Sequence, residues 1–286
     1  MNATLAHSRL SAGLLEHHVQ LACALEVSAP KPGNITPAHD FSDTTYADMV
    51  RSALCLGPVF AHRRALRRSV GELIADGVHA TAQVARANTN LGIVLLFAPL
   101  VHAAVTRQAN EPLRSAVERT LAQLDVDDAA AAFTAIAGAN PGGLGDAVQH
   151  DVRAPARISL RDAMAAAAHR DSIASEYATG YAIVFDGGLP LLGDALRNGL
   201  STLDSIVSVH VGLLASHPDT LIARKGGGAA ARAVTDAARE VRAGTRSLAD
   251  FDASLRQDGN QLNPGTTADL VAATLLAALL TGVRLP

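Results

Sequence analysis

The sequence has few aromatic residues and few cysteines. Only 3% of its 286 residues are aromatic, none is Trp, and the two cysteines are Cys23 and Cys55. Two cysteines cannot form the disulfide framework of a small secreted domain, so both are expected to be small buried hydrophobic residues. The apolar residues are mostly Ala and Leu, which favour helices, whereas aromatic and β-branched residues favour strands. The composition therefore predicts an all-α protein.

A strong excess of charge is also missing. The formal net charge is −3 at pH 7, and charged residues make up 18% of the chain against 49% apolar. No basic surface is available to neutralise a nucleic-acid backbone, so a nucleic-acid partner is not expected. The apolar content excludes an intrinsically disordered chain. Because no change in composition marks a linker, we expect a single domain over residues 1–286.

Long apolar runs and several well-known motifs are absent. The N-terminal segment lacks an apolar run of signal-peptide length, and the longest apolar stretch, residues 270–283, is too short to span a bilayer. We therefore expect a cytoplasmic protein without a membrane partner. There is no Walker A sequence, no Cys-x-x-Cys, no His-Glu-x-x-His and no Gly-x-Ser-x-Gly. Standard nucleotide folds, zinc sites and serine hydrolases are poorly supported.

The helical period of apolar residues runs through most of the chain. It predicts helices over residues 14–27, 46–66, 70–86, 91–107, 113–124, 127–139, 159–185, 189–216, 228–242 and 263–280. Pro99 is expected to kink or break its helix. With no alternating strand pattern and no internal repeat, the predicted fold is an all-α, single-domain bundle of many helices.

Loops rich in Gly, Pro and polar residues interrupt these helices. They cover residues 28–34, 139–146, 217–220 with 224–228, and 263–266. In an all-helical protein, ligands tend to bind where helix ends and such loops converge. We expect these loops to form a nucleotide site.

Three acidic residues lie on predicted apolar helical faces, each near a loop or a helix start. They are Glu26, Asp171 and Asp269. A carboxylate on a core face needs a partner, because burying it bare is costly. For Glu26 two interpretations stay open, a salt bridge to Lys31 and a metal or substrate ligand. Inward-facing carboxylates in helical bundles bind hard cations, and three separate hydrogen-bonded acids are the alternative.

Two predicted helix starts and one basic segment could bind phosphate. Asn263 can cap the last helix and residues 88–90 can open another, and free amides at a helix start attract phosphate. Arg224 and Lys225 stand beside a run of three glycines, which suits a polyphosphate. A plain cap and a solvated basic turn are the alternative interpretations.

In chain order these segments resemble the triphosphoribosyl-dephospho-CoA synthase family, whose members serve citrate lyase and malonate decarboxylase. The matching segments are residues 26–34 (EVSAPKPGN) with Asp40, 88–92 (NTNLG), Arg170-Asp171 with Glu176-Tyr177, Asp219-Thr220, 224–226 (RKG) and 263–270 (NPGTTADL). The Pro-Lys-Pro-Gly and Pro-Gly-x-x-Ala-Asp-Leu segments are the most specific. The ordered set extends from one end of the chain to the other.

The resemblance implies an all-helical transferase that uses Mg²⁺ and takes ATP as a substrate. ATP is joined through its ribose to 3′-dephospho-CoA, and adenine is released while the triphosphate is kept. This is a glycosyl transfer with an oxocarbenium-like centre. The expected partners are a small-molecule nucleotide and an acceptor substrate, and a homodimer is compatible with the sequence.

Candidate site residues follow from the pattern and the resemblance together. The metal candidates are Asp40, Asp171, Asp269 and Glu26, and the catalytic candidates are Asp40, Asp171 and Glu26. The nucleotide-binding candidates are Lys31, Arg224 and Lys225 for phosphates, and Asn34, Asn90, Asn263 and Thr266 for neutral hydrogen bonds.

One segment departs from the family's pattern. Members in citrate lyase systems carry Asn-Thr-His-Lys-Gly, whereas this chain has Asn90 and Leu91 in place of His and Lys. The loss of up to two charges predicts that dephospho-CoA is a poor acceptor while ATP still binds. The alternatives are the same scaffold acting on another cofactor precursor, such as a pterin-type C1 carrier, and a non-catalytic helical nucleotide-binding protein.

Overall fold

The computed structural model describes residues 12–85, 89–139, 151–257 and 259–285. Asn88 and most of the predicted loop 139–146 lie outside the described residues. The described residues contain no strand, and their one isolated bridge joins Thr36 and His39. The all-α prediction is therefore confirmed.

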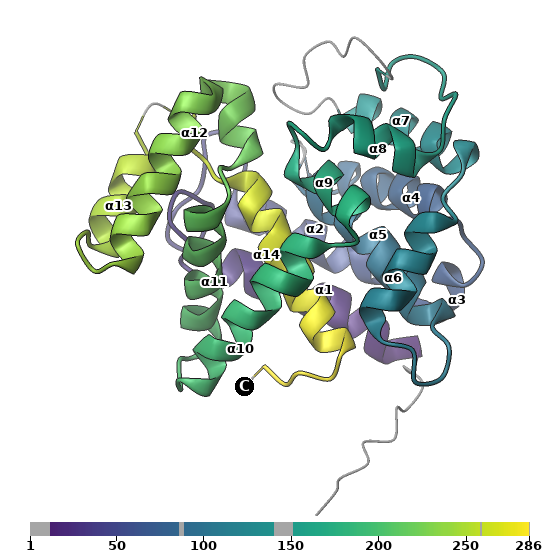
Figure 1. Cartoon of the computed structure of the whole chain (residues 1–286), viewed down its shortest axis with the longest axis horizontal. Helices are drawn as coiled ribbons and strands as arrows, with labels where there is room; N and C mark the ends of the chain where they lie inside the picture. The colour runs from purple at the N-terminus through teal and green to yellow at the C-terminus, as the bar shows by residue number, and fades with distance from the viewer. Residues whose placement is uncertain (1–11, 86–88, 140–150, 258, 286) are drawn as a thin grey trace, which may run out of the picture.

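The described residues form fourteen α-helices and one π-helical segment, η1. In chain order they are α1 (Ala12–Ser28), α2 (Tyr46–Val59), α3 (His62–Ala65), α4 (Val70–Ala82), α5 (Leu91–Thr106), α6 (Leu113–Ala122), α7 (Val126–Ala139), α8 (Leu160–Ala167), α9 (Ser172–Thr179), η1 (Ile183–Gly188), α10 (Leu189–Arg197), α11 (Thr202–Ser216), α12 (Thr220–Arg242), α13 (Leu248–Leu255) and α14 (Gly265–Leu280). Figure 1 shows α14 in the middle, with α11, α12 and α13 on one side and α4 to α8 on the other.

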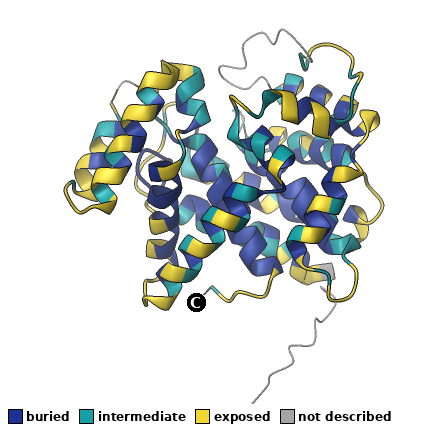
Figure 2. Ribbon diagram, viewed as in Figure 1, coloured by how far each residue is buried: buried dark blue, intermediate teal, exposed yellow. Residues whose placement is uncertain are grey.

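The centre of the core is formed by α5 and α14. Both are apolar around nearly their whole circumference, which is typical of a buried helix, and almost every residue of α14 after Gly265 is buried. This helix packs against α1, α5, α11 and η1, and Figure 2 shows the buried residues concentrated on these inner helices. The apolar stretch near the C-terminus is thus a core helix.

No single described helix is both long enough and apolar enough to cross a membrane. Together α11 and α12 meet the criteria of length and composition, but they are bent by 45° at the break between them.

The central helix α5 continues through Pro99 instead of ending there. A proline has no N–H, so the carbonyl oxygen four residues earlier, that of Leu95, loses its helical donor. The fully buried hydroxyl of Tyr177 donates to this oxygen at 2.6 Å, and that of Tyr181 donates to the next one, Leu96 O, at 2.8 Å. The helix persists because a side-chain donor replaces the missing amide.

The long helix predicted over residues 159–185 is wrong, because the chain breaks twice. After α8 ends, Asp171 takes the N-cap position of α9, so it does not lie on a helical face. Gly180 then ends α9 in the left-handed conformation, which glycine adopts without steric cost. The buried Glu176 carboxylate accepts the backbone N–H groups of Ile183 (2.9 Å) and Val184 (3.0 Å) where η1 begins.

Other predicted helices differ from the structure in their bounds. The helix predicted over 46–66 is divided into α2 and α3, and the one over 189–216 into α10 and α11, which begins after the capping Ser201. The predicted helix 228–242 begins earlier, at Thr220, because Asp219 caps it. The glycine run remains as a break inside α12, where Gly227 has a φ of 85°. Polar side chains cap the starts of α11 and α12, whereas α3 begins after Ala61 without a side-chain cap.

We expect Tyr177→Phe to lower the free energy of unfolding by about 1–3 kcal/mol, because Leu95 O is left buried without a donor. In a Pro99→Ala background the loss should be much smaller, since the amide of residue 99 then supplies the N–H. Urea unfolding of the four proteins measures this coupling. Tyr181→Phe is the matched control, since its acceptor does not depend on residue 99. Equal losses in both backgrounds would contradict this account of α5.

Candidate active site

The starts of three helices are tied together by hydroxyl groups. The backbone N–H of Ser172, in α9, donates to the hydroxyl oxygen of Thr220, in α12, at 3.3 Å. The hydroxyl of Thr220 in turn donates to that of Thr266, in α14, at 3.2 Å. Because the N-terminal end of a helix carries partial positive charge, this arrangement creates a region that favours negative groups.

One buried carboxylate caps two of these helices. Asp219 is 2% exposed, and its Oδ1 accepts the backbone N–H groups of Leu221 (2.8 Å) and Ile222 (3.1 Å) in the first turn of α12. Its Oδ2 accepts the backbone N–H (2.7 Å) and the hydroxyl (2.8 Å) of Thr267 in the first turn of α14. The N-cap residue of α14 itself, Pro264, has no side-chain cap. Asp219 therefore performs for α14 the function that its own N-cap residue cannot.

A second carboxylate caps α9 and holds a cation. The Oδ1 of Asp171 accepts the N–H groups of Ile173 (2.9 Å) and Ala174 (3.1 Å), and its Oδ2 lies 2.6 Å from a guanidinium nitrogen of Arg224. Both partners of this ion pair are about a quarter exposed. The structure thus brings two predicted site residues, Asp171 and Arg224, into direct contact.

A third carboxylate, that of Asp269, makes no hydrogen bond or ion pair to a described residue. It lies against the start of α5, because a Cβ placed on Gly92 would be only 2.0 Å from its Oδ2. At that helix start the side chain of the N-cap residue, Asn90, makes no capping hydrogen bond, and its buried Oδ1 has no partner. Glycine at position 92 is what makes room for the carboxylate.

The neighbours of Asp269 are mostly acidic. Burial raises the pKa of its carboxyl well above the ordinary value, and the nearby charges of Glu26, Asp219 and Asp171 raise it further, while Arg224 lowers it. An ionised Asp269 is therefore unfavourable unless a cation is close.

The predicted metal ligand Glu26 and the predicted phosphate ligand Lys31 pair with each other. The Lys31 ammonium is fully buried, lies 2.9 Å from Glu26 Oε1, and also donates to the Glu26 carbonyl oxygen. Of the two interpretations of Glu26, the structure has the salt bridge. A side chain that is fully buried and paired in this way has no surface that a phosphate could contact.

The loop after α1 is held by a histidine that the sequence analysis missed. The amide nitrogen of Asn34 lies 3.4 Å from Nε2 of the fully buried His210, in α11. Burial, with a further contribution from the Lys31 charge, lowers the pKa of His210 to about 3, so its ring is neutral and Nε2 can accept. From α13, Arg256 donates to the Asn34 carbonyl oxygen at 3.0 Å. Asn34 is therefore a structural anchor of the loop.

The remaining predicted residues are more scattered. Asn263 does not cap α14, which begins at Gly265, because Pro264 takes the N-cap position; the buried Oδ1 of Asn263 has no partner. Lys225 is exposed beside the glycine break. Asp40 is exposed, and its carboxylate accepts the backbone N–H of Tyr46 at 2.6 Å in the loop before α2.

Mg²⁺ requires oxygen ligands, which Asp and Glu side chains can supply. No group of three or more His, Cys, Asp or Glu side chains among the described residues is arranged as a ready-made metal site. Mg²⁺ is commonly held by one or two carboxylates together with substrate phosphates. Asp269 and the three carboxylates around it make four, but they have only two cationic partners among the described residues, Lys31 and Arg224. This excess of negative charge fits a hard cation brought with a nucleotide.

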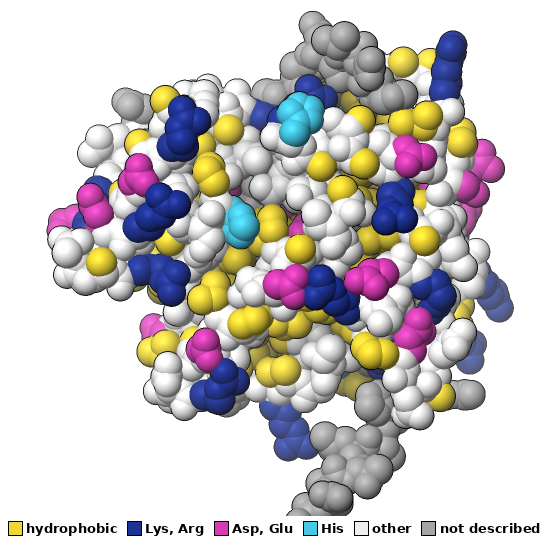
Figure 3. All heavy atoms as spheres, in the orientation of Figure 1, with side chains coloured by type: hydrophobic (Ala, Val, Ile, Leu, Met, Phe, Trp, Pro, Cys, Tyr) yellow, Lys and Arg dark blue, Asp and Glu magenta, His cyan; other side chains and the backbone are white. Residues whose placement is uncertain are grey.

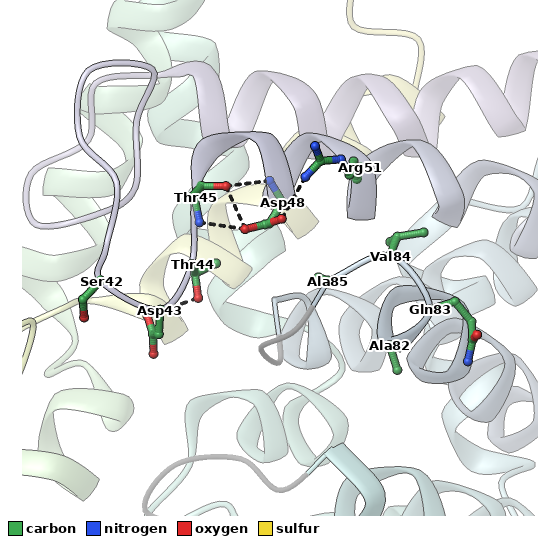
Figure 4. A pocket seen from close by; sticks show the side chains of 10 residues that line it. All are labelled: Ser42, Asp43, Thr44, Thr45, Asp48, Arg51, Ala82, Gln83, Val84 and Ala85. Carbon is green, nitrogen blue, oxygen red and sulfur yellow. Dashed lines mark hydrogen bonds and ion pairs between the residues drawn. The ribbon is translucent and has the colours of Figure 1, made fainter.

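A separate hollow of about 800 Å³ lies between the start of α2 and the end of α4. Figure 4 shows residues 42–45, Asp48 and Arg51 on one side and residues 82–85 on the other, with the polar groups of Thr45 and Asp48 already bonded to each other. None of the clustered carboxylates lines it. The hollow and the carboxylate cluster are therefore separate features of the structure.

Charges on the molecular face in Figure 3 are mixed, with Lys and Arg scattered among acidic and apolar side chains. No large surface of one charge sign is visible among the described residues on this face.

The fold and the site define an all-helical protein in which helix starts, carboxylates and a few cations converge. The model of the ATP:dephospho-CoA triphosphoribosyl transferase family matches residues 12–285. The chain belongs to this family, and it is a transferase that joins the triphosphoribosyl part of ATP to dephospho-CoA.

A solved structure supports this membership. It is described as a candidate triphosphoribosyl-dephospho-CoA synthase from Archaeoglobus fulgidus. The two sequences are 28% identical, and the superposition has a TM-score of 0.66 over 82% of this chain and 99% of the other. No curated protein sequence matches the chain. Family membership favours dephospho-CoA as the acceptor over a pterin-type carrier or non-catalytic binding, against the expectation drawn from Asn90 and Leu91.

We expect Lys31→Met to destabilise the fold by about 3–5 kcal/mol, because it leaves the Glu26 carboxylate buried without its cation. Adding Glu26→Gln should recover part of the loss. Chemical denaturation measures both, and the exposed Lys225→Met is the control that should leave stability unchanged. A fully stable Lys31→Met variant that binds ATP weakly would instead show that Lys31 contacts phosphate.

Proposed function

We propose that the carboxylate cluster around Asp269 is the Mg-ATP site of the triphosphoribosyl transfer. The observation that supports this most directly is that the Asp269 carboxylate has no hydrogen-bond or ion-pair partner among the described residues. Of the four clustered carboxylates, those of Glu26, Asp171 and Asp219 have described partners, and that of Asp269 has none. An unpartnered carboxylate that is surrounded by negative charge and lies at a helix start is suited to a cation that arrives with the substrate.

Asp269 and Asp171 would hold the Mg²⁺, which when bound neutralises the charge of the triphosphate. Arg224 is already at the cluster through its pair with Asp171 and would bind a phosphate oxygen, as charge-assisted contacts of Arg do. The exposed Lys225, beside the glycine break of α12, would add a second phosphate contact. We leave Glu26 out of the metal group because it is buried in its ion pair with Lys31, whereas Asp171 is about a quarter exposed. Asp40 is left out because it is not among the charges that act on Asp269.

The start of α5 would lie beside the reacting part of the nucleotide. During transfer the acceptor hydroxyl oxygen bonds to C1 of the ribose, and the bond from C1 to adenine breaks with its electron pair going to adenine. The proton that the hydroxyl gives up balances the one that adenine takes up as it leaves in its neutral form. Buried polar groups without partners are suited to orienting such a substrate. Asn90, with its unpartnered Oδ1, and Thr266 are our candidates for these neutral contacts.

The possible homodimer and the cytoplasmic location stay predictions.

The reaction itself can be tested with the purified protein, Mg-ATP and 3′-dephospho-CoA, with products read by mass spectrometry. We expect adenine to appear in equal amount to triphosphoribosyl-dephospho-CoA. Reactions without acceptor, without Mg²⁺ and with a reduced pterin in place of dephospho-CoA are the controls. Binding of ATP without adenine release in the complete reaction would contradict the assignment.

The residues can be tested by calorimetry of Mg-ATP binding. Asp269→Asn and Asp171→Asn should each raise the dissociation constant roughly tenfold or more, since each removes a charged ligand at nearly constant shape. Arg224→Gln should do the same through loss of a phosphate contact. The matched control is Asp186→Asn, which breaks an ion pair with Arg114 away from the cluster. Unchanged binding by both site aspartate variants would refute the proposed metal group.

A further inference from the structure

We propose that Asp219 is a positioning residue, which sets the place of the Asp269 carboxylate by holding the start of α14. This inference rests on the proposed function of Asp269. Asp219 belongs to a segment that resembles the family but is not one of the candidate site residues, and it is too deeply buried and too fully bonded to contact a substrate itself.

The link between the two residues is short and rigid. Thr267, which gives both its N–H and its hydroxyl to Asp219, precedes Asp269 by two residues in the same helix. An orphan amide in the first turn of a helix must find an acceptor when it is buried, and Pro264 supplies none. Asp219 therefore decides where the first turn of α14 lies.

Close packing at the same point supports this. A Cβ on Gly265, the first residue of α14, would lie 2.6 Å from the Leu221 side chain in α12. The two helix starts thus touch at Gly265 as well as at the Asp219–Thr267 hydrogen bonds. At the other side of α14, Asp269 fits against Gly92 with no room for even a methyl group. A small shift of the first turn would therefore move the carboxylate relative to α5, and interiors this dense transmit such shifts.

Residue 219 is a carboxylate and not a neutral capping residue, and this is explained by its bonds to two helix starts instead of one. A single helix start needs only a neutral cap such as Ser, as α8 and α13 have. A carboxylate has two oxygens and can accept from two helix ends at once, and the partial positive charge of both ends offsets part of the cost of burying it. This geometry favours a cross-linking function over simple capping.

The experiment compares Asp219→Asn with Asp128→Asn in steady-state transfer assays and thermal melts. The control Asp128 is also a buried carboxylate with both oxygens bonded to backbone amides, those of Gly71 and Asp125, but it joins α7 to α4. The amide oxygen of an Asn can still accept from the first turn of α12, whereas its nitrogen, in the place of Oδ2, cannot accept from Thr267. We expect both variants to melt earlier, and Asp219→Asn alone to lose about tenfold or more in kcat, the effect of a slightly misplaced catalytic group.

Two milder substitutions, both at Thr267, test the same contact with less risk of unfolding the protein. Thr267→Val removes the hydroxyl donor to Asp219 and should lower kcat several-fold, whereas Thr267→Ser keeps the donor and should restore wild-type kcat. Mg-ATP calorimetry gives a second readout, in which Asp219→Asn and Thr267→Val should bind more weakly and Asp128→Asn should not. If Asp219→Asn does not fold, the Thr267 pair decides the question.

The failures of the two proposals can be told apart. If the wild-type protein transfers and Asp269→Asn is inactive, but Asp219→Asn and Thr267→Val retain wild-type kcat and Mg-ATP affinity, Asp219 is only structural and the positioning proposal is overturned. If Asp269→Asn itself is fully active and binds Mg-ATP normally, the proposed metal site has failed instead.

Discussion

A single buried carboxylate joins the two helices on which the site depends. Asp219 accepts four hydrogen bonds, two from the first turn of α12 and two from Thr267 of α14. Burying an ionised group is costly unless strong donors surround it, and two helix starts supply such donors with their partial positive charge. The central helix α14 and the helix that carries Arg224 are fixed relative to each other for this reason.

An all-helical fold offers few places where polar backbone groups remain available, and the helix starts are among them. The described site uses four, those of α5, α9, α12 and α14. Carboxylates from Asp171 and Asp219 satisfy three of them, while Asp269 faces the fourth without a hydrogen bond. The resulting excess of negative charge is the reason why we propose that a nucleotide with its own cation binds here.

The hydrophobic core and the site are connected through α5. Its first turn receives Asp269, and its middle contains Pro99, whose missing amide is replaced by the hydroxyl of Tyr177 from α9. The helix that Asp171 caps is thus also the helix that completes the hydrogen bonding of α5. Movement of α9 would disturb both, so the position of the carboxylates depends on contacts well inside the apolar core.

Local features of the sequence were sufficient for the all-α class, for most helices and for three of the four acidic residues that the structure brings together, Glu26, Asp171 and Asp269. Periodicity reports which face of a helix is buried, and capping residues report where a helix starts. The helix predicted over 159–185 failed because Asp171 competes for backbone amides, which apolar periodicity does not reveal.

The partners of the polar residues were decided only by the tertiary structure. Periodicity indicates that Glu26 faces inward, but not that its neighbour there is Lys31 and not a metal. The bond between Asp219 and Thr267 spans 48 residues, and that between Asn34 and His210 spans 176. Such pairs form because packed helices bring distant segments into contact, and no local pattern encodes which residue lies opposite. The residue types of the site were thus visible in the sequence, while the division into paired and unpaired carboxylates was set by the packing of α14 between α1, α5 and α12.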